Sequence, residues 1–132
     1  MNSELAAEHD RQYHKLLAFI AKMESVDPSW TCVVKFYASM HLITAYLVMK
    51  SNTRFDSDSG SHHERRKAID RCPELNVAKR YYRELKDLSE AVRYVPGYIF
   101  TAKNDSDSSK RLESIRSIVE PLLKKLFGGS KR

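Results

Sequence analysis

Apolar residues recur at helical spacing along most of the chain. In residues 3–25 they fall at about every third or fourth position, with charged residues on the opposite side, which is the pattern of an amphipathic helix. The same spacing returns in residues 74–94 and again in residues 112–126. The sequence has no alternating run long enough for a sheet, so the pattern predicts an all-α fold, a single-domain bundle of four to five up-and-down helices.

The segment 28–50 has a different pattern, because 15 of the 20 residues from 30 to 49 are apolar. Its length approaches that of a membrane span, but Lys35, Ser39, His41 and Thr44 interrupt it and the other helices are amphipathic and charged. We therefore expect the central buried helix of a bundle, with no membrane contact. Asp27 followed by Pro28 predicts where this helix begins. Trp30, which lies near this start, is interpreted as a core anchor.

Residues that favour turns and helix ends separate the predicted helices. Residues 51–61 form a polar loop, and Ser61 with Glu64 is a capping-box pattern that opens a short third helix. Pro73 is expected to end or kink that helix. A Pro-Gly pair at 96–97 stops the fourth helix.

The C-terminal part of the chain is expected to be a loop followed by a fifth helix. Residues 98–108 read as a loop with a helix cap, and Pro121 is expected to kink the helix after it. A chain of this length suits one domain. We expect residues 1–127 to form it and residues 128–132 to be a flexible basic tail.

Composition narrows the class of protein without giving its function. The 132 residues include 23 Lys and Arg and 17 Asp and Glu, a net charge of +6, which permits a polyanionic partner but does not require one. The two cysteines make neither a disulfide framework nor a metal spacing, and no secretory signal is visible. We therefore expect a cytoplasmic protein that has no cofactor and no bound metal.

The positive charge is uneven along the chain. Residues 62–94 carry nine basic and six acidic side chains, and residues 103–132 carry eight and four, whereas residues 1–61 carry one more acidic than basic side chain. A solvated helix face accounts for most such excess, and a nucleic-acid surface is the alternative.

His41 is the candidate acid or base of the second helix. At 100° per residue it shares a face with Trp30 and Tyr37, while Lys35 and Ser39 lie on the far side. This placement predicts that His41 points into the bundle. A hydrogen-bonded core histidine is the alternative to a catalytic one.

Tyr82, Ser89 and Arg93 form a polar line along the fourth helix. They stand at i, i+7 and i+11, within about 20° of one another around the helix axis. The line borders the apolar stripe, where an arginine needs an anionic partner. A salt bridge to a neighbouring helix and a ligand site both remain open.

Imidazole and guanidinium groups gather at the start of the third helix, where His62, His63, Arg65 and Arg66 lie together. The free amides and the dipole of a helix start attract anions, so the cluster suits a phosphate. A metal site is not expected. The histidines lack the spacing of a zinc pair, and the preceding DSDSG run puts Lys67 where a calcium loop needs Glu.

Three strings follow one another along the chain: SWTCVVKFYASMHLITAYL, SHHERRKAI and YYRELKDLSEAVRY. By their order and spacing they resemble a prokaryotic branch of the HEPN superfamily, which comprises small helical nucleotide-binding domains. The resemblance covers residues 28–94. It implies a four- or five-helix bundle, commonly dimeric, in a superfamily that includes RNA-cleaving toxins and defence factors. The residues that match are His41 in the aromatic-rich helix, His62 and Arg65 in a His-x-x-Arg turn, and Ser89, Arg93 and Tyr94 at a helix end. His63 and Arg66 fit the turn in an alternative register.

The sequence departs from the ribonuclease members of that superfamily, because it contains no Arg-x4-6-His motif. Two functions stay open, and with them whether the chain is an enzyme. One is a homodimer that binds RNA or a nucleotide phosphate in a groove, with His41 as a candidate acid or base. The other is a non-catalytic dimerisation or protein-interaction module. The predicted groove is lined by His41, His62, Arg65, Tyr82, Ser89 and Arg93.

Overall fold

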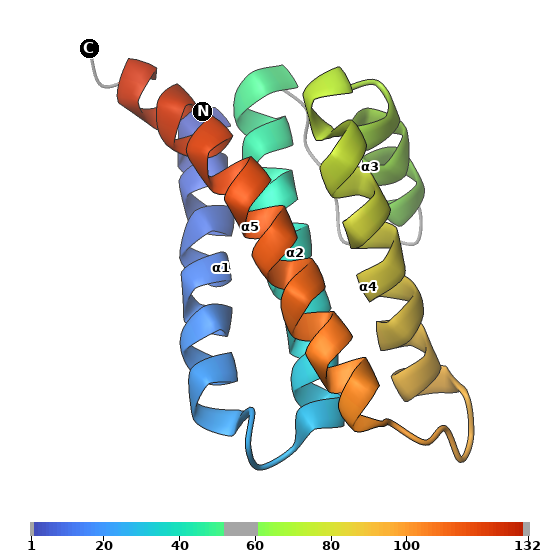
Figure 1. Ribbon diagram of the computed structural model, residues 1–132. Helices are drawn as coiled ribbons and strands as arrows, with labels where there is room; N and C mark the ends of the chain where they lie inside the picture. Colours follow the sequence, from blue (N-terminus) through green and yellow to red (C-terminus); the bar gives the residue numbers. More distant parts are fainter. Residues whose placement is uncertain (1, 52–60, 131–132) are drawn as a thin grey trace.

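Five α-helices and one 3-10 turn make up the computed structural model, which describes residues 2–51 and 61–130 (Figure 1). The elements are α1 (Asn2–Met23), α2 (Pro28–Ser51), α3 (Ser61–Asp70), the 3-10 turn η1 (Pro73–Leu75), α4 (Asn76–Tyr94) and α5 (Ala102–Ser130). No strand occurs within these ranges. The predicted all-α bundle is therefore confirmed.

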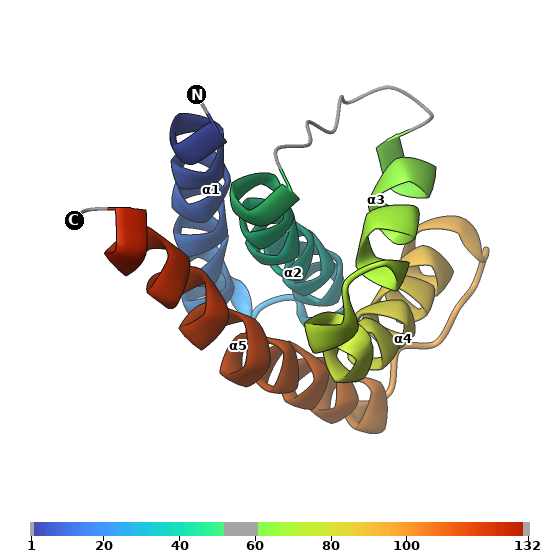
Figure 2. The same cartoon turned by 90° about the horizontal axis from the view of Figure 1, so that it is seen from above.

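α2 is the central helix of the bundle. It contacts α1, α4 and α5, and Figure 2 shows it with α1 on one side and α3 and α4 on the other, while α5 crosses the bundle. By length and composition α2 could cross a membrane, but 78% of its apolar window is buried inside the bundle. Burial of this kind is typical of a core helix.

The predicted helix ends at Asp27, Pro73 and Gly97 are confirmed. The Asp27 carboxylate accepts a hydrogen bond from the backbone amide of Trp30 at 3.1 Å, so it caps α2. Pro73 begins the 3-10 turn that separates α3 from α4. Gly97 has a φ of +71°, which favours glycine, in the turn after α4. Most of the predicted loop at 51–61, together with the Ser61 side chain of the capping box, lies outside the described residues.

α5 begins earlier than predicted, so the expected loop over 98–108 is wrong from Ala102 onward. Thr101 and Asn104 cap the helix reciprocally. The Asn104 amide donates to Thr101 Oγ1 at 3.1 Å, and the Thr101 amide donates to Asn104 Oδ1 at 3.0 Å. The polar run after Asn104 is therefore helical.

α5 continues past Pro121 to Ser130. Proline has no amide to donate to the carbonyl of Ser117, and Figure 2 shows α5 following a curved path. The helix thus extends three residues into the segment that we predict to be a tail. Residues 131–132 lie outside the described part of the chain.

The burial of α2 differs from the prediction at several positions. Trp30 is 50% exposed, so it is not the core anchor expected from sequence. Tyr37 and His41, on the same face, are half-buried. Lys35 and Ser39, predicted to lie away from the core, are buried.

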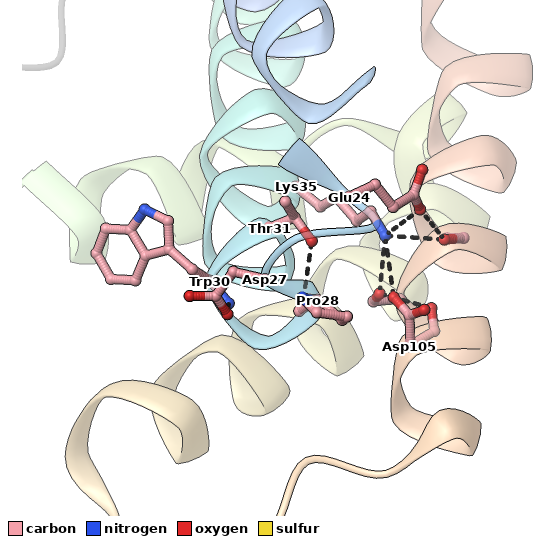
Figure 3. A network of polar contacts seen from close by, with 9 residues as sticks. Glu24, Asp27, Pro28, Trp30, Thr31, Lys35 and Asp105 are labelled. Carbon is pink, nitrogen blue, oxygen red and sulfur yellow. Dashed lines mark hydrogen bonds and ion pairs between the residues drawn. The ribbon is translucent and has the colours of Figure 1, made fainter. Parts of the chain in front are cut away.

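Lys35 is buried because carboxylates and hydroxyls from two other segments surround its ammonium (Figure 3). Nζ lies 2.9 Å from Glu24 Oε1 and 3.6 Å from Asp105 Oδ1. It also donates to Ser109 Oγ at 2.8 Å and to Ser108 Oγ at 3.3 Å. A charge is tolerated inside a protein when it has such partners. Since these partners come from the end of α1 and the start of α5, the pattern of α2 alone could not predict them.

Candidate functional site

A groove of about 420 Å³ lies between α3 and α4 and is lined mainly by basic side chains. Its lining residues are His62, His63, Arg66 and Ile69 of α3 with Lys79, Tyr82, Arg83, Lys86 and Asp87 of α4. Four of these nine are Lys or Arg, two are His, and one is a carboxylate. A concave surface with this composition attracts anions.

Carboxylates near the groove neutralise part of its charge. Asp70 Oδ1 lies 3.2 Å from both Lys79 Nζ and Arg83 Nη2, and Glu90 Oε1 lies 2.7 Å from Lys86 Nζ. These pairs are partly exposed, so water screens them and leaves the lysines and arginine free to exchange partners.

Arg66 has no carboxylate within ion-pair distance among the described residues. Its Nη2 lies 3.5 Å from His63 Nδ1, at the limit of a hydrogen bond. Both side chains are exposed. They form the pair of the alternative His-x-x-Arg register and line the groove together.

Arg65 is buried behind the groove, with 5% of its surface exposed. Its Nε donates to Thr44 Oγ1 at 2.9 Å, its Nη1 lies 3.4 Å from His62 Nδ1, and it also hydrogen-bonds Tyr82. Burial lowers the pKa of the guanidinium and the nearby Tyr82 opposes this, but an arginine stays charged at neutral pH. Arg65 therefore joins α3 to α2 and α4 and brings positive charge behind the groove.

His62 lies where three cations meet. Burial lowers the pKa of its imidazole, and the charges of Arg65, Lys86 and Arg93 lower it further, while Glu90 raises it. His62 is therefore neutral at pH 7. An anion bound among these cations would raise this pKa again.

Arg93 lies in an aromatic cluster next to His62. Its Nη1 donates to the Tyr37 hydroxyl at 2.8 Å and to the Tyr94 hydroxyl at 3.2 Å. Its guanidinium carbon lies 5.4 Å and 4.8 Å from the centroids of the same two rings, within cation–π range. Among the residues that the structure describes, no carboxylate pairs with Arg93. Its charge is therefore not cancelled locally.

His41 pairs with His9 of α1, a residue that sequence reasoning missed. The two Nδ1 atoms lie 2.9 Å apart and the ring centroids 5.2 Å apart. One ring must donate and the other accept. Burial, followed by the charges of His9 and Arg65, lowers the pKa of His41 to about 4, and burial and Arg65 also lower the pKa of His9. Both imidazoles are therefore neutral at pH 7. The one available signal was that His9 stands four residues before the buried Tyr13, on the same helix face.

The structure does not bring the six predicted site residues together in one place. His62 and Tyr82 line the α3–α4 groove, Arg65 and Arg93 lie beside it, and His41 faces α1. Ser89 is fully buried, and its hydroxyl has no hydrogen-bond partner within the described ranges.

Three basic groove residues of α4 were also missed. Lys79, Arg83 and Lys86 stand at i, i+4 and i+7, so they share one face of the helix. That spacing was readable in the sequence. The spacing alone does not indicate a binding site, because basic residues on one face of a helix usually form only a solvated surface.

A second hollow, of about 710 Å³, lies between α1, α2 and α5. Its charged groups balance one another, since Asp10 and Glu120 face it together with Arg116 and Lys124. Glu120 accepts hydrogen bonds from the Tyr13 hydroxyl and from Arg116 Nε. This hollow therefore lacks the positive excess of the α3–α4 groove.

No protein-family model matches this chain, and neither a curated protein nor a solved structure matches it. The resemblance to the HEPN superfamily therefore stays a prediction. Within the described residues, no group of three or more His, Cys, Asp and Glu side chains is placed to hold a metal ion. Cys32 and Cys72 are buried and free.

Proposed function

We propose that this chain binds RNA through its phosphates, in the groove between α3 and α4. The observation that carries the proposal is the convergence of basic side chains from two helices on one groove of about 420 Å³. Contacts between Lys or Arg and phosphate supply most of the sequence-independent affinity of nucleic-acid-binding proteins. A free nucleotide phosphate would use the same contacts and is the smaller ligand of this class.

The position of the groove at the start of α3 supports a phosphate ligand. His62 and His63 stand in the first turn of this helix, where the helix dipole favours a negative charge. Arg65 Nη1 lies 3.4 Å from His62 Nδ1, and Arg93 is close enough for its charge to affect the same imidazole. An anion placed there would interact with cations from both α3 and α4.

The proposal is for binding and does not include cleavage. His41, the candidate acid or base, does not line the groove and its Nδ1 lies within hydrogen-bond distance of His9. A general acid or base must reach the reacting atoms. Binding alone requires only the cations.

Fluorescence anisotropy with a labelled RNA oligonucleotide over a series of salt concentrations tests the proposal. The double variant Arg66→Gln/Lys86→Gln should lower the affinity at least about tenfold and reduce the slope of log affinity against log salt by about one and a half units, since it removes two charges. The control Lys22→Gln/Lys125→Gln removes the same charge from exposed positions on α1 and α5. It should bind nearly as the unchanged protein does. Equal losses in both variants, or no binding by the unchanged protein, would contradict the proposal.

A second candidate function is a dimerisation or protein-interaction module. Large apolar side chains are exposed after α4, at Val95, Tyr98 and Ile99, and exposed apolar groups of this kind occur at protein interfaces. The HEPN resemblance implies a homodimer. Sedimentation equilibrium of the unchanged protein and of Ile99→Asp tests this candidate, which predicts a dimer for the first and a monomer for the second.

A further inference from the structure

The two most exposed aromatic rings among the described residues lie near the end of the bundle where α2 begins and α4 ends. Tyr94 is 68% exposed and Trp30 is 50% exposed, whereas Tyr13 and Phe36 are buried. Exposing a large ring to water is unfavourable unless the ring has a partner. Rings exposed in this way are accessible to a ligand that stacks on them.

Trp30 and Tyr94 lie at the same end of the bundle, and Arg93 links Tyr94 to the face of α2 that carries Trp30. Trp30 and Tyr37 are seven residues apart, close to two helical turns, so they share a face of α2. Arg93 contacts both Tyr37 and Tyr94. Because α2 and α4 run antiparallel in Figure 1, Tyr94 follows Arg93 towards the end where Trp30 lies. Figure 3 shows the indole of Trp30 pointing away from Lys35 and its carboxylates.

Arg93 also lies near the groove between α3 and α4. Arg93 is close enough to His62, a groove residue, for its charge to affect that imidazole. The cationic side chains that could bind phosphates therefore lie near the aromatic rings that could stack on bases. Nucleic-acid surfaces that bind single strands combine these same two elements.

We propose that Trp30, Tyr94 and Arg93 form a base-stacking platform, which makes this chain prefer single-stranded over double-stranded RNA. The inference rests on the RNA binding proposed above. Bases of a single strand are free to stack on aromatic rings and guanidinium planes, whereas bases of a duplex already stack on one another. The platform would therefore add affinity for a single strand and none for a duplex of equal charge.

The experiment compares a single-stranded RNA oligonucleotide with a duplex of the same length at fixed salt. Trp30 is the sole tryptophan of the chain, so its fluorescence should be quenched by the single strand and unchanged by the duplex. In anisotropy assays with labelled RNA, Trp30→Ala and Tyr94→Ala should each lower single-strand affinity about tenfold and leave duplex affinity and the salt slope unchanged.

Val26→Ala is the matched control, because Val26 is 69% exposed in the turn before α2, at the same end of the bundle, but has no ring. It should leave single-strand affinity unchanged, and Tyr94→Phe, which keeps the ring, should retain most of it. Circular dichroism melts check that these variants remain folded.

Three results would overturn the platform. They are equal losses of single-strand and duplex affinity in the aromatic variants, a loss in Val26→Ala as large as theirs, and a change of oligomeric state in Trp30→Ala or Tyr94→Ala, which would indicate a protein partner. If RNA binds and the aromatic variants bind it normally, the platform alone is wrong. If neither RNA binds, the proposed function is wrong as well.

Discussion

Lys35 and Arg93 are two basic side chains on opposite sides of α2, and their surroundings differ. The Lys35 side chain is 2% exposed and lies within 4 Å of two carboxylates, Glu24 and Asp105. Arg93 is half-buried, and the polar side-chain groups that it contacts are the hydroxyls of Tyr37 and Tyr94. A cation whose charge is cancelled nearby holds helices together. A cation that contacts neutral groups keeps its field, which a phosphate can use.

The largest effect that follows from this comparison concerns stability. Lys35→Met leaves Glu24 and Asp105 beside an apolar group, so we expect the free energy of unfolding to fall by about 2–3 kcal/mol. Denaturant titrations followed by circular dichroism measure it. The control is Lys103→Met, since Lys103 is 82% exposed and pairs with Asp107 within α5; its change should stay below about 0.5 kcal/mol. An equal loss of unfolding free energy in the two variants would show that the buried ion pairs of Lys35 stabilise the fold no more than an exposed pair does.

A second prediction concerns the histidine pair. Unfolded His41 takes up a proton with an ordinary pKa near 6.5, whereas in the folded protein its pKa is about 4. The unfolded state therefore binds more protons between these values, and stability falls as pH drops through this window. We expect this group to account for a loss of roughly 2 kcal/mol between pH 7 and 4.5. The stability of His41→Gln should depend less on pH in denaturant titrations across that range, and an unchanged dependence would show that His41 is not the group responsible.

Arg93→Gln tests the other side of the comparison. Removing this charge should lower RNA affinity about fivefold to tenfold and reduce the salt slope by up to about one unit. The free energy of unfolding should change by less than about 1 kcal/mol, because no carboxylate among the described residues is left unpaired. Anisotropy and denaturant titrations on the same sample measure both. A stability loss as large as that of Lys35→Met, with unchanged affinity, would make Arg93 a structural residue.

The smallest expected effect is that of Tyr37→Phe. This variant removes the hydroxyl that accepts from Arg93 and keeps the ring beneath the guanidinium. RNA affinity should stay within about twofold and stability within about 1 kcal/mol, since a neutral hydrogen bond contributes little net free energy. A loss of affinity equal to that of Arg93→Gln would mean that the position of the guanidinium matters more than its charge.

The parts of the fold that depend on local chemistry were predictable from sequence. Asp27 caps α2 and Pro73 separates two helices, because caps and prolines act within a few residues. The start of α5 was missed because its cap uses Asn104 in place of the usual Glu or Gln, and the polar run after it resembles a loop.

The orientation of α2 could not be predicted, because it depends on residues far away in the chain. Lys35 is buried only because Glu24 and Asp105 meet its ammonium. The candidate site also has a part that was predictable from local sequence and a part that was not. The cluster at His62 was visible as a local run, whereas the pairing of His41 with His9 depends on the packing of two helices.

Chemical-shift mapping tests the central claim most directly. Backbone amide spectra of the ¹⁵N-labelled protein are recorded while a single-stranded RNA oligonucleotide is added. We expect the amides around His62, Lys86 and Arg93 to shift, while those of Glu24 and Asp105 beside Lys35 stay in place. Shifts centred on Glu24 and Asp105, or no shifts in α3 and α4, would contradict the account.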